Sequence, residues 1–319
     1  MRLQKGSILL LSAIIASFFP QLVFAHAGSR GHVLLLPTQL YIQGGAAVVV
    51  LTFVVMIFVV RKPFFGQHQI LESSEIEIEP NVWLSLLSML ILILLIWIGF
   101  TGNRDPITNL LPLTIWVFWW IGFTMLTALF GNFWAIISPW NVLHKMVGYF
   151  SVIQIRKKRS FVEAERWAYW PAVILFFGFA WLELVHPSPM DPDTLAWFVS
   201  LYILLTTFGI IFFGGEFWLK KGEPFSIFFR MVGWLSPFTR KTNKGQNSLW
   251  GIGISWPCAG LLRSESLPTG GVAFVLLVLS TVSFDGLSKT FWWLSLVEKN
   301  PLEFPGRTEM IQPNTLGLC

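Results

Sequence analysis

Residues 179–193 read FAWLELVHPSPMDPD, and this stretch sets the architecture of the chain. An apolar helix runs into a proline-rich, acidic turn, and a second apolar segment begins directly after it. Pro187 is expected to end the first helix, because proline lacks a backbone N–H and clashes with the preceding helical turn. Two apolar helices joined by so short a turn are predicted to form a tight hairpin.

The composition of the chain is that of a membrane protein. Of its 319 residues, 54% are hydrophobic and only 12% are charged. Soluble domains carry about 25% charged residues, so the chain is predicted to be an all-α, polytopic bundle embedded in the lipid bilayer. The net charge of +5 gives no indication of nucleic-acid binding, because its basic residues lie in loops between apolar segments. Cys258 and Cys319 are too far apart in sequence to indicate a disulfide framework.

The first 25 residues have the pattern of a secretory signal peptide. Arg2 and Lys5 precede an apolar run over residues 8–19, and a small-residue cleavage site ends at Ala25. The alternative is an uncleaved first helix. Cleavage after Ala25 would leave His26 as the mature N-terminus, on the non-cytoplasmic side.

Residues 26–293 are predicted to form a transmembrane domain, and residues 294–319 a polar, non-cytoplasmic tail. About six spans are expected, at residues 39–60, 82–100, 113–137, 168–185, 195–213 and 271–282. After the signal peptide, 15 Lys and Arg lie in segments assigned to the inner side and 5 in outer segments. Because cytoplasmic loops are enriched in Lys and Arg, this asymmetry predicts a multi-pass protein of the bacterial inner membrane.

Two aromatic segments have predicted places relative to the membrane. The Trp-rich run at 116–120 is expected to form an aromatic belt near the outer face, because Trp favours membrane interfaces. The apolar and basic segment at 222–234 is expected to lie on the inner membrane surface.

The predicted topology gathers most of the His and Asp of the chain on the outer face. The candidate site residues are His26, His32, Glu183, His186, Asp191, Asp193 and Asp285. Carboxylates within a span are costly unless they are paired or solvated, so Glu183 and Asp285 are functional candidates. Both lie about one turn from a predicted helix end, so interfacial carboxylates paired with Lys289 or Arg104 are the alternative.

A metal site is one interpretation of this constellation. Glu183 and His186 are three residues apart and would share a helix face as ligands of zinc, iron or manganese. Asp285, Asp191 or Asp193 would supply a further ligand or a catalytic base. A divalent metal could generate a hydroxide nucleophile from bound water. Separately, the amine and ring of a terminal His26 could chelate copper, with His32 as a third nitrogen donor.

Several strings along the chain together resemble a known family. They are HAG at 26–28, GNFWAIISPW at 131–140, FAWLELVHP at 179–187, GEPFS at 222–226 and SFDGLS at 283–288. The chain resembles a bacterial family of multi-spanning membrane proteins commonly labelled fenitrothion hydrolase. The resemblance implies hydrolysis of an aryl phosphorothioate triester, an organophosphorus compound, and it assigns no catalytic residue. Members of that family usually continue into further spans where this chain stops, which is typical of a truncated product.

Two other classes of function remain open. A transporter or metal-handling protein would use the outer cluster as a loading site and Asp285 within a pathway. A non-catalytic membrane subunit or assembly factor would bind membrane protein partners through its inner loops. Only the hydrolase requires a small-molecule substrate that is chemically changed.

Overall fold

A computed structural model describes residues 81–149, 167–240, 252–254, 257–264, 266–300 and 305–319, with isolated positions between 43 and 54. The chain divides into two compact units, Met1–Glu75 and Ile76–Cys319. In the first unit the described positions are helical and fall within the predicted span at 39–60. The predicted signal peptide, His26 and His32 lie outside the described residues.

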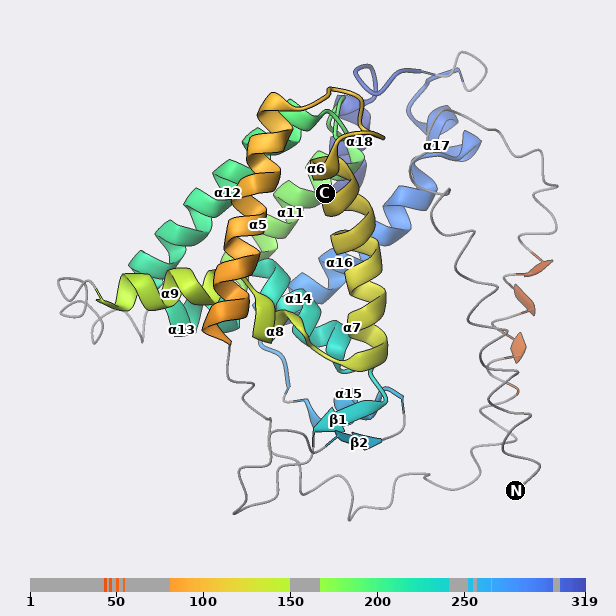
Figure 1. Ribbon diagram of the computed structural model, residues 1–319. Helices are drawn as coiled ribbons and strands as arrows, with labels where there is room; N and C mark the ends of the chain where they lie inside the picture. Colours follow the sequence, from red (N-terminus) through yellow and green to blue (C-terminus); the bar gives the residue numbers. More distant parts are fainter. Residues whose placement is uncertain are drawn as a thin grey trace, which may run out of the picture. The chain divides into compact units, whose positions relative to one another are not determined.

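The second unit is built from long apolar helices (Figure 1). Among the described residues, four are long and apolar enough to cross a membrane: α5 (Val82–Thr101), the continuous helix Leu110–Phe130, α12 (Pro192–Phe213) and α16 (Thr269–Leu287). A shorter apolar helix, α11 (Trp170–Leu184), has 15 residues. These helices confirm the predicted helical class and support a membrane protein, whereas the count of six spans stays a prediction.

Residues at the helix ends explain where these helices begin and stop. The side chain of Asn81 accepts hydrogen bonds from two backbone N–H groups at the start of α5, and Asn109 accepts one at the start of Leu110–Phe130. Helices α7 (Thr124–Phe130) and α12 end at Gly131 and Gly214, whose φ angles are 98° and 88°. Glycine suits both positions because it has no side chain to oppose a positive φ.

The helix Leu110–Phe130 changes its winding along its length. It starts as α6 (Leu110–Pro112), continues as the π-helical segment η1 (Leu113–Phe123) and ends as α7. A π-helix is wider than an α-helix and is frequent at functional sites. Its side chains Trp116, Trp119 and Trp120 all point into the bundle rather than forming a belt, as their contacts below show.

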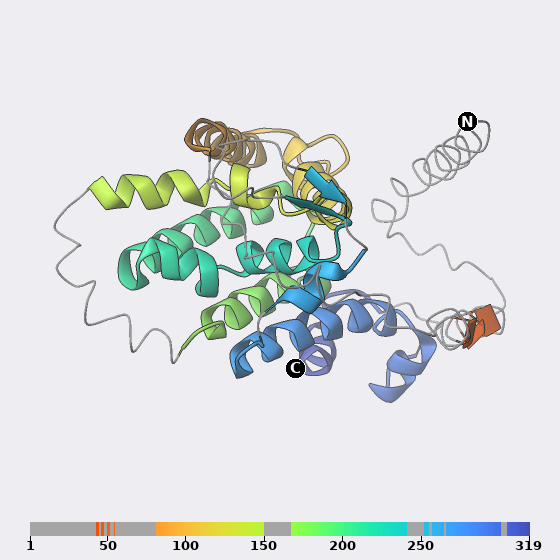
Figure 2. The same ribbon diagram turned by 90° about the horizontal axis from the view of Figure 1, so that it is seen from below.

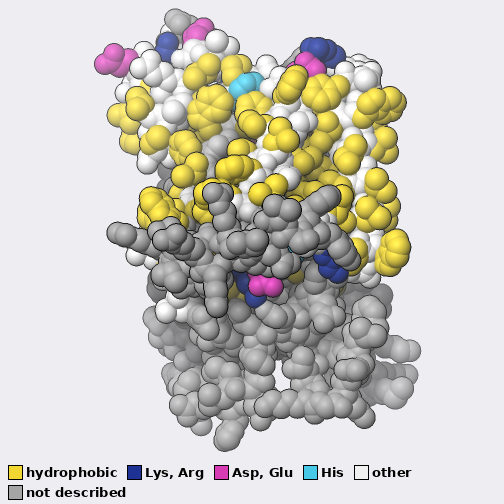
Figure 3. All heavy atoms as spheres, turned by 90° about the vertical axis from the view of Figure 1, so that its left-hand side faces the viewer, with side chains coloured by type: hydrophobic (Ala, Val, Ile, Leu, Met, Phe, Trp, Pro, Cys, Tyr) yellow, Lys and Arg dark blue, Asp and Glu magenta, His cyan; other side chains and the backbone are white. Residues whose placement is uncertain are grey.

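The outward faces of the helices carry apolar side chains. Hydrophobic groups cover much of the side of the bundle in Figure 3, and α5 alone exposes Trp83, Leu87, Leu90 and Trp97. A soluble protein rarely exposes a contiguous apolar patch of this kind, whereas lipid tails are as apolar as these side chains. The surface is therefore compatible with contact to a lipid bilayer.

The long helices pack closely in pairs, α5 along α12 and α11 along α16. A Cβ atom added at Gly99 of α5 would lie 2.4 Å from the Leu111 side chain and 2.9 Å from Cβ of Ala196 on α12. Only glycine allows this approach. Small residues at helix contacts are typical of membrane bundles, where dispersion forces rather than the hydrophobic effect hold helices together.

The two ends of the bundle are called inner and outer after the predicted orientation. The inner end carries α8 (Trp134–Ile137), α9 (Trp140–Tyr149), α13 (Gly215–Phe217), η3 (Trp218–Gly222), α15 (Ala259–Arg263), and β1 (Phe238–Arg240) paired antiparallel with β2 (Ile252–Ile254). The outer end carries α17 (Phe291–Leu296) and α18 (Ile311–Leu318).

Residues 294–319 are predicted to form a polar tail. The part of this segment that the structure describes packs against the bundle. The indole N–H of Trp181 on α11 donates to the Thr315 hydroxyl at 3.0 Å. The indole N–H of Trp293 donates to the Asn314 side chain at 2.8 Å. Helix α18 is thus held against α11 and α17 by polar as well as apolar contacts.

Helix α14 (Pro224–Gly233) lies inside the bundle, not on its inner surface as the sequence suggested. It packs between α7 and α11, and Figure 2 shows this arrangement from the inner end. Ile227 and Phe229 are both fully buried, although two residues span about 200° around a helix. A helix on a membrane surface buries one face only, so burial of both faces means that protein surrounds α14.

The start of α14 reaches the middle of the long helices. The Phe228 ring centroid lies 5.1 Å from that of Trp120, near the midpoint of Leu110–Phe130, and 6.1 Å from that of Phe176 in α11. Glu223, which precedes α14, contacts the hydroxyl of Tyr202 near the midpoint of α12. The chain therefore enters the bundle from the inner end and turns at about mid-depth.

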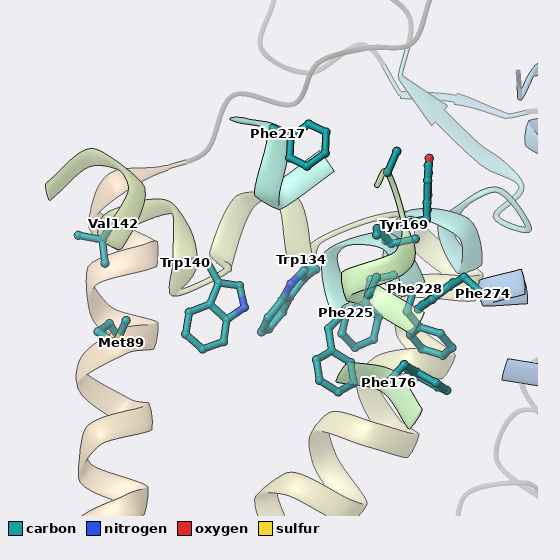
Figure 4. Packing of buried hydrophobic residues seen from close by; sticks show 14 residues of the cluster. Met89, Trp134, Trp140, Val142, Tyr169, Phe176, Phe217, Phe225, Phe228 and Phe274 are labelled. Atoms are coloured by element: carbon teal, nitrogen blue, oxygen red, sulfur yellow. The ribbon is translucent and has the colours of Figure 1, made fainter. Parts of the chain in front are cut away.

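An aromatic core surrounds α14 (Figure 4). Trp134, Trp140, Phe176, Phe225 and Phe274 all belong to it. Trp119 lies 4.5 Å from Phe225 between ring centroids, and the Trp116 indole donates to the Pro189 carbonyl at 3.0 Å. The Trp residues predicted to form an interfacial belt are thus part of the interior.

Replacing Phe229 with alanine tests this core. The ring is fully buried and lies 5.0 Å from Phe123 and 5.3 Å from Trp134. Phe229→Ala should lower the free energy of unfolding by about 3–5 kcal/mol, as large-to-small core substitutions do. Thermal unfolding in detergent measures this, with Phe208→Ala on the exposed face of α12 as the control. Equal loss in the two variants would contradict a core role for Phe229.

Candidate functional site at the outer end

Glu183 lies on the last turn of α11, inside the outer end of the bundle. Its Oε1 accepts a hydrogen bond from the indole N–H of Trp120 at 3.1 Å, and the side chain is half-buried. The charges of Asp285, Lys289 and Arg307 act on its carboxyl group. Two separate parts of the chain, one with Asp285 and Lys289 and one with Arg307, thus bring ionisable groups to this carboxylate.

His186 does not share a helix face with Glu183. α11 ends at Leu184, and the backbone N–H groups of Val185 and His186 both donate to the Trp181 carbonyl. The His186 ring packs against Trp181 and Phe198, with centroids 5.8 Å and 5.6 Å away. The chain leaves the helix just before Pro187, so the helical spacing on which the prediction is based does not extend to His186.

Arg307 is a site residue that the sequence analysis missed. Its guanidinium donates to the backbone carbonyls of Glu183 and His186, each at 3.1 Å. The last carbonyls of a helix have no partner within the helix and attract positive charge. Arg307 supplies both the hydrogen-bond donors and the positive charge at the end of α11. Because it comes from a segment over 100 residues away, no local sequence pattern could indicate this contact.

Asp285 near the end of α16 forms an ion pair with Lys289 just after that helix, with Lys289 Nζ 2.7 Å from Oδ1. Both groups are partly exposed to solvent. An exposed pair of this kind contributes less than about 1 kcal/mol. The alternative anticipated from the sequence, an interfacial carboxylate paired with Lys289, therefore describes Asp285.

Asp191 and Asp193 belong to a second group, centred on Arg104. The Asp193 carboxylate lies 3.4 Å and the Asp191 carboxylate 3.9 Å from the Arg104 guanidinium. Asp191 also caps α12, because one of its oxygens accepts hydrogen bonds from the Thr194 backbone N–H at 2.9 Å and hydroxyl at 2.8 Å. Partial burial opposes the charged form of Asp191, but the bonds from Thr194 and the Arg104 charge lower its pKa overall.

The donors required for a metal are only partly present in the described residues. No group of three His, Cys, Asp or Glu lies close enough to share an ion there. Nδ1 of His186 accepts a hydrogen bond from the Ser188 backbone N–H at 3.1 Å. A neutral imidazole whose Nδ1 accepts carries its proton on Nε2, so metal binding would require this bond to break. The metal site expected at Glu183 and His186, and the separate copper site expected at His26 and His32, stay predictions.

Comparisons with known proteins add no constraint to this geometry. Neither models of protein families, nor curated proteins, nor solved structures give a match to the chain.

Asp191 offers a test of the helix cap. Asp191→Ala should lower the free energy of unfolding by about 1 kcal/mol, and Asp191→Asn, which keeps a capping oxygen, should lower it by much less. Because the pKa of Asp191 is lower in the folded chain, its charge stabilises the fold fully above the unfolded-state pKa. This contribution is lost as the pH falls through the folded-state pKa. Chemical unfolding at neutral and acidic pH measures both effects, and equal stability of Ala and Asp forms would refute the cap.

Proposed function

We propose that the chain is an integral protein of the bacterial inner membrane that hydrolyses organophosphorus triesters at the Glu183 cluster. The cluster comprises Glu183, Asp285, Lys289 and Arg307. The family resemblance suggests the reaction, and one structural observation supports the Glu183 cluster as its site. That observation is a half-buried carboxylate with cations nearby, at the end of an apolar bundle.

Glu183 is the proposed general base. The Trp120 indole N–H donates a hydrogen bond to its Oε1, and no hydrogen bond to Oε2 comes from the described residues. A water bound there would pass a proton to the carboxylate while its oxygen attacks phosphorus, and the bond to the aryl oxygen would break to release a phenolate. General-base catalysis of this kind typically contributes about 10²–10⁴ in rate.

The cations nearby suit the charge that develops during this reaction. Attack on a neutral triester places negative charge on the phosphoryl oxygen or thiono sulfur and on the leaving phenolate. Lys289 and Arg307 would stabilise that negative charge electrostatically. Trp120, Trp181 and Phe198 supply apolar surface for an aryl group.

Nitrophenol release from fenitrothion tests the proposal. Membranes containing the chain should release the phenol, and Glu183→Gln should lower the rate about 100-fold or more, because glutamine cannot accept the proton. Glu309→Gln, an exposed carboxylate at the same end, is the matched control and should keep full activity. Unchanged activity in Glu183→Gln would place the reaction elsewhere, and a chelator added to the wild type shows whether a metal takes part.

The native cysteines test the proposed orientation. Cys258 is exposed next to α15 at the inner end, which the proposal places in the cytoplasm. In a Cys319→Ser background, a membrane-impermeant maleimide should leave Cys258 unlabelled in intact spheroplasts and label it after lysis. Labelling of Cys258 in intact spheroplasts would reverse the orientation and place the Glu183 cluster in the cytoplasm.

A further inference from the structure

A second carboxylate, Glu223, is buried deep in the bundle and takes no part in the outer cluster. Its side chain is fully buried. One oxygen accepts from the backbone N–H of Phe225 at 3.1 Å and the other from that of Ser226 at 2.6 Å. The hydroxyl of Tyr202 on α12 makes a further, very close contact with it.

Capping α14 does not require an acid at this position. Asn, Ser and Thr cap helices as well as acidic residues do and carry no charge. An ionised carboxylate away from water costs several kcal/mol unless a cation pairs with it. Within the described part of the chain, no Lys, Arg or His forms an ion pair with Glu223. The acid is thus present at a cost that a neutral cap would avoid.

An unpaired polar group lies beside the same pair. Trp140 on α9 is only 3% exposed, and its ring centroid lies 5.5 Å from that of Tyr202. Its indole N–H has no hydrogen-bond partner among the described residues. Buried polar groups nearly always have a partner, which is often an ordered water. The unpaired donor therefore indicates a small polar guest such as water next to Tyr202.

The titratable groups on the elements around Glu223 include Tyr202 on α12, His144 on α9, Arg230 on α14, and Lys220 and Lys221 on η3. On α12 it faces Tyr202, and Thr206 lies fully buried one helical turn further along. On α9, His144 packs against Gly215 at the start of α13. On α14, Arg230 donates to the Lys220 carbonyl of η3 at 2.8 Å and does not pair with Glu223. Tyr202 is therefore the titratable side chain seen in contact with the acid.

We propose that Glu223 and Tyr202 form a proton-binding site inside the bundle, served by a water held at Trp140. At neutral pH the site holds a carboxylic acid whose Oε1 accepts a hydrogen bond from the Tyr202 hydroxyl. When the acid gives its proton to the water, a hydronium ion leaves and a carboxylate remains. The N–H groups of Phe225 and Ser226 then stabilise that carboxylate together with the Tyr202 hydroxyl.

This site extends the function of the chain beyond chemistry at its outer end. Ionisable groups at membrane depth typically belong to proton or ion pathways. The Trp120 indole donates to Glu183, its ring centroid lies 6.4 Å from that of Phe225, and the Phe225 backbone N–H donates to Glu223. Packed aromatic rings lie between the two acids. The Glu223 site is therefore expected to exchange protons with the inner side only. Its existence does not depend on the hydrolase proposal.

Infrared spectroscopy of the chain in lipid tests this site directly. At neutral pH the wild type should show the C=O stretching band of a protonated carboxylic acid, shifted in D2O. In a Glu183→Gln background, which removes the half-buried acid of the outer cluster, the band should remain, and adding Glu223→Gln, which keeps a capping oxygen, should remove it. Tyr202→Phe, which leaves the acid but removes its partner, should move the band to higher frequency.

The proposal is overturned if the wild type has no such band, or if the band survives when Glu223→Gln is added to Glu183→Gln. Should Glu223→Gln fail to fold, the Tyr202→Phe variant decides, because an unshifted band there means that the protonated acid lies elsewhere. A band that responds to both substitutions supports the site whether or not the chain hydrolyses triesters.

Discussion

The packing of α14 among the long helices is the interaction on which the rest of the bundle depends. Lipid offers no partners to backbone or side-chain polar groups, so a chain that turns inside a membrane bundle must satisfy them internally. Glu223 does this for the first turn of α14. The apolar side chains of α14 then meet α7 and α11 on either side and hold the aromatic core together. The Glu223 site exists because of this turn.

The long helices could be predicted from the sequence because apolar length alone defines a span, and because Pro187 indicates where α11 must end. The position of α14 could not be predicted from the sequence. A ten-residue helix rich in Phe, with Arg230 in its last turn, has the same composition whether lipid or protein covers it. Burial of both Ile227 and Phe229 depends on α7 and α11, which lie far away in sequence.

Some ionisable side chains at the outer end stabilise the fold, whereas Glu183 is available for chemistry. Asp191 caps a helix, and Asp193 and Asp285 are paired with Arg104 and Lys289. Glu183 differs, because its hydrogen-bond donor is an indole and its neighbourhood holds both signs of charge. The sequence indicated Glu183 from its cost in a span, yet it paired that residue with His186, which the helix end separates from it. Arg307 belongs to this cluster only because the folded chain brings it to the carbonyls of Glu183 and His186.

The measurement that tests this account most directly is the water accessibility of the two opposite faces of α14. Single cysteines at Ile227 and Phe229, in a chain whose native cysteines are serine, would be treated in native membranes with a water-soluble maleimide. Both positions are fully buried, so neither should react until the protein is unfolded. Reaction at one of the two positions in the folded protein would mean that α14 lies on the membrane surface, and would remove the basis for a buried Glu223 site.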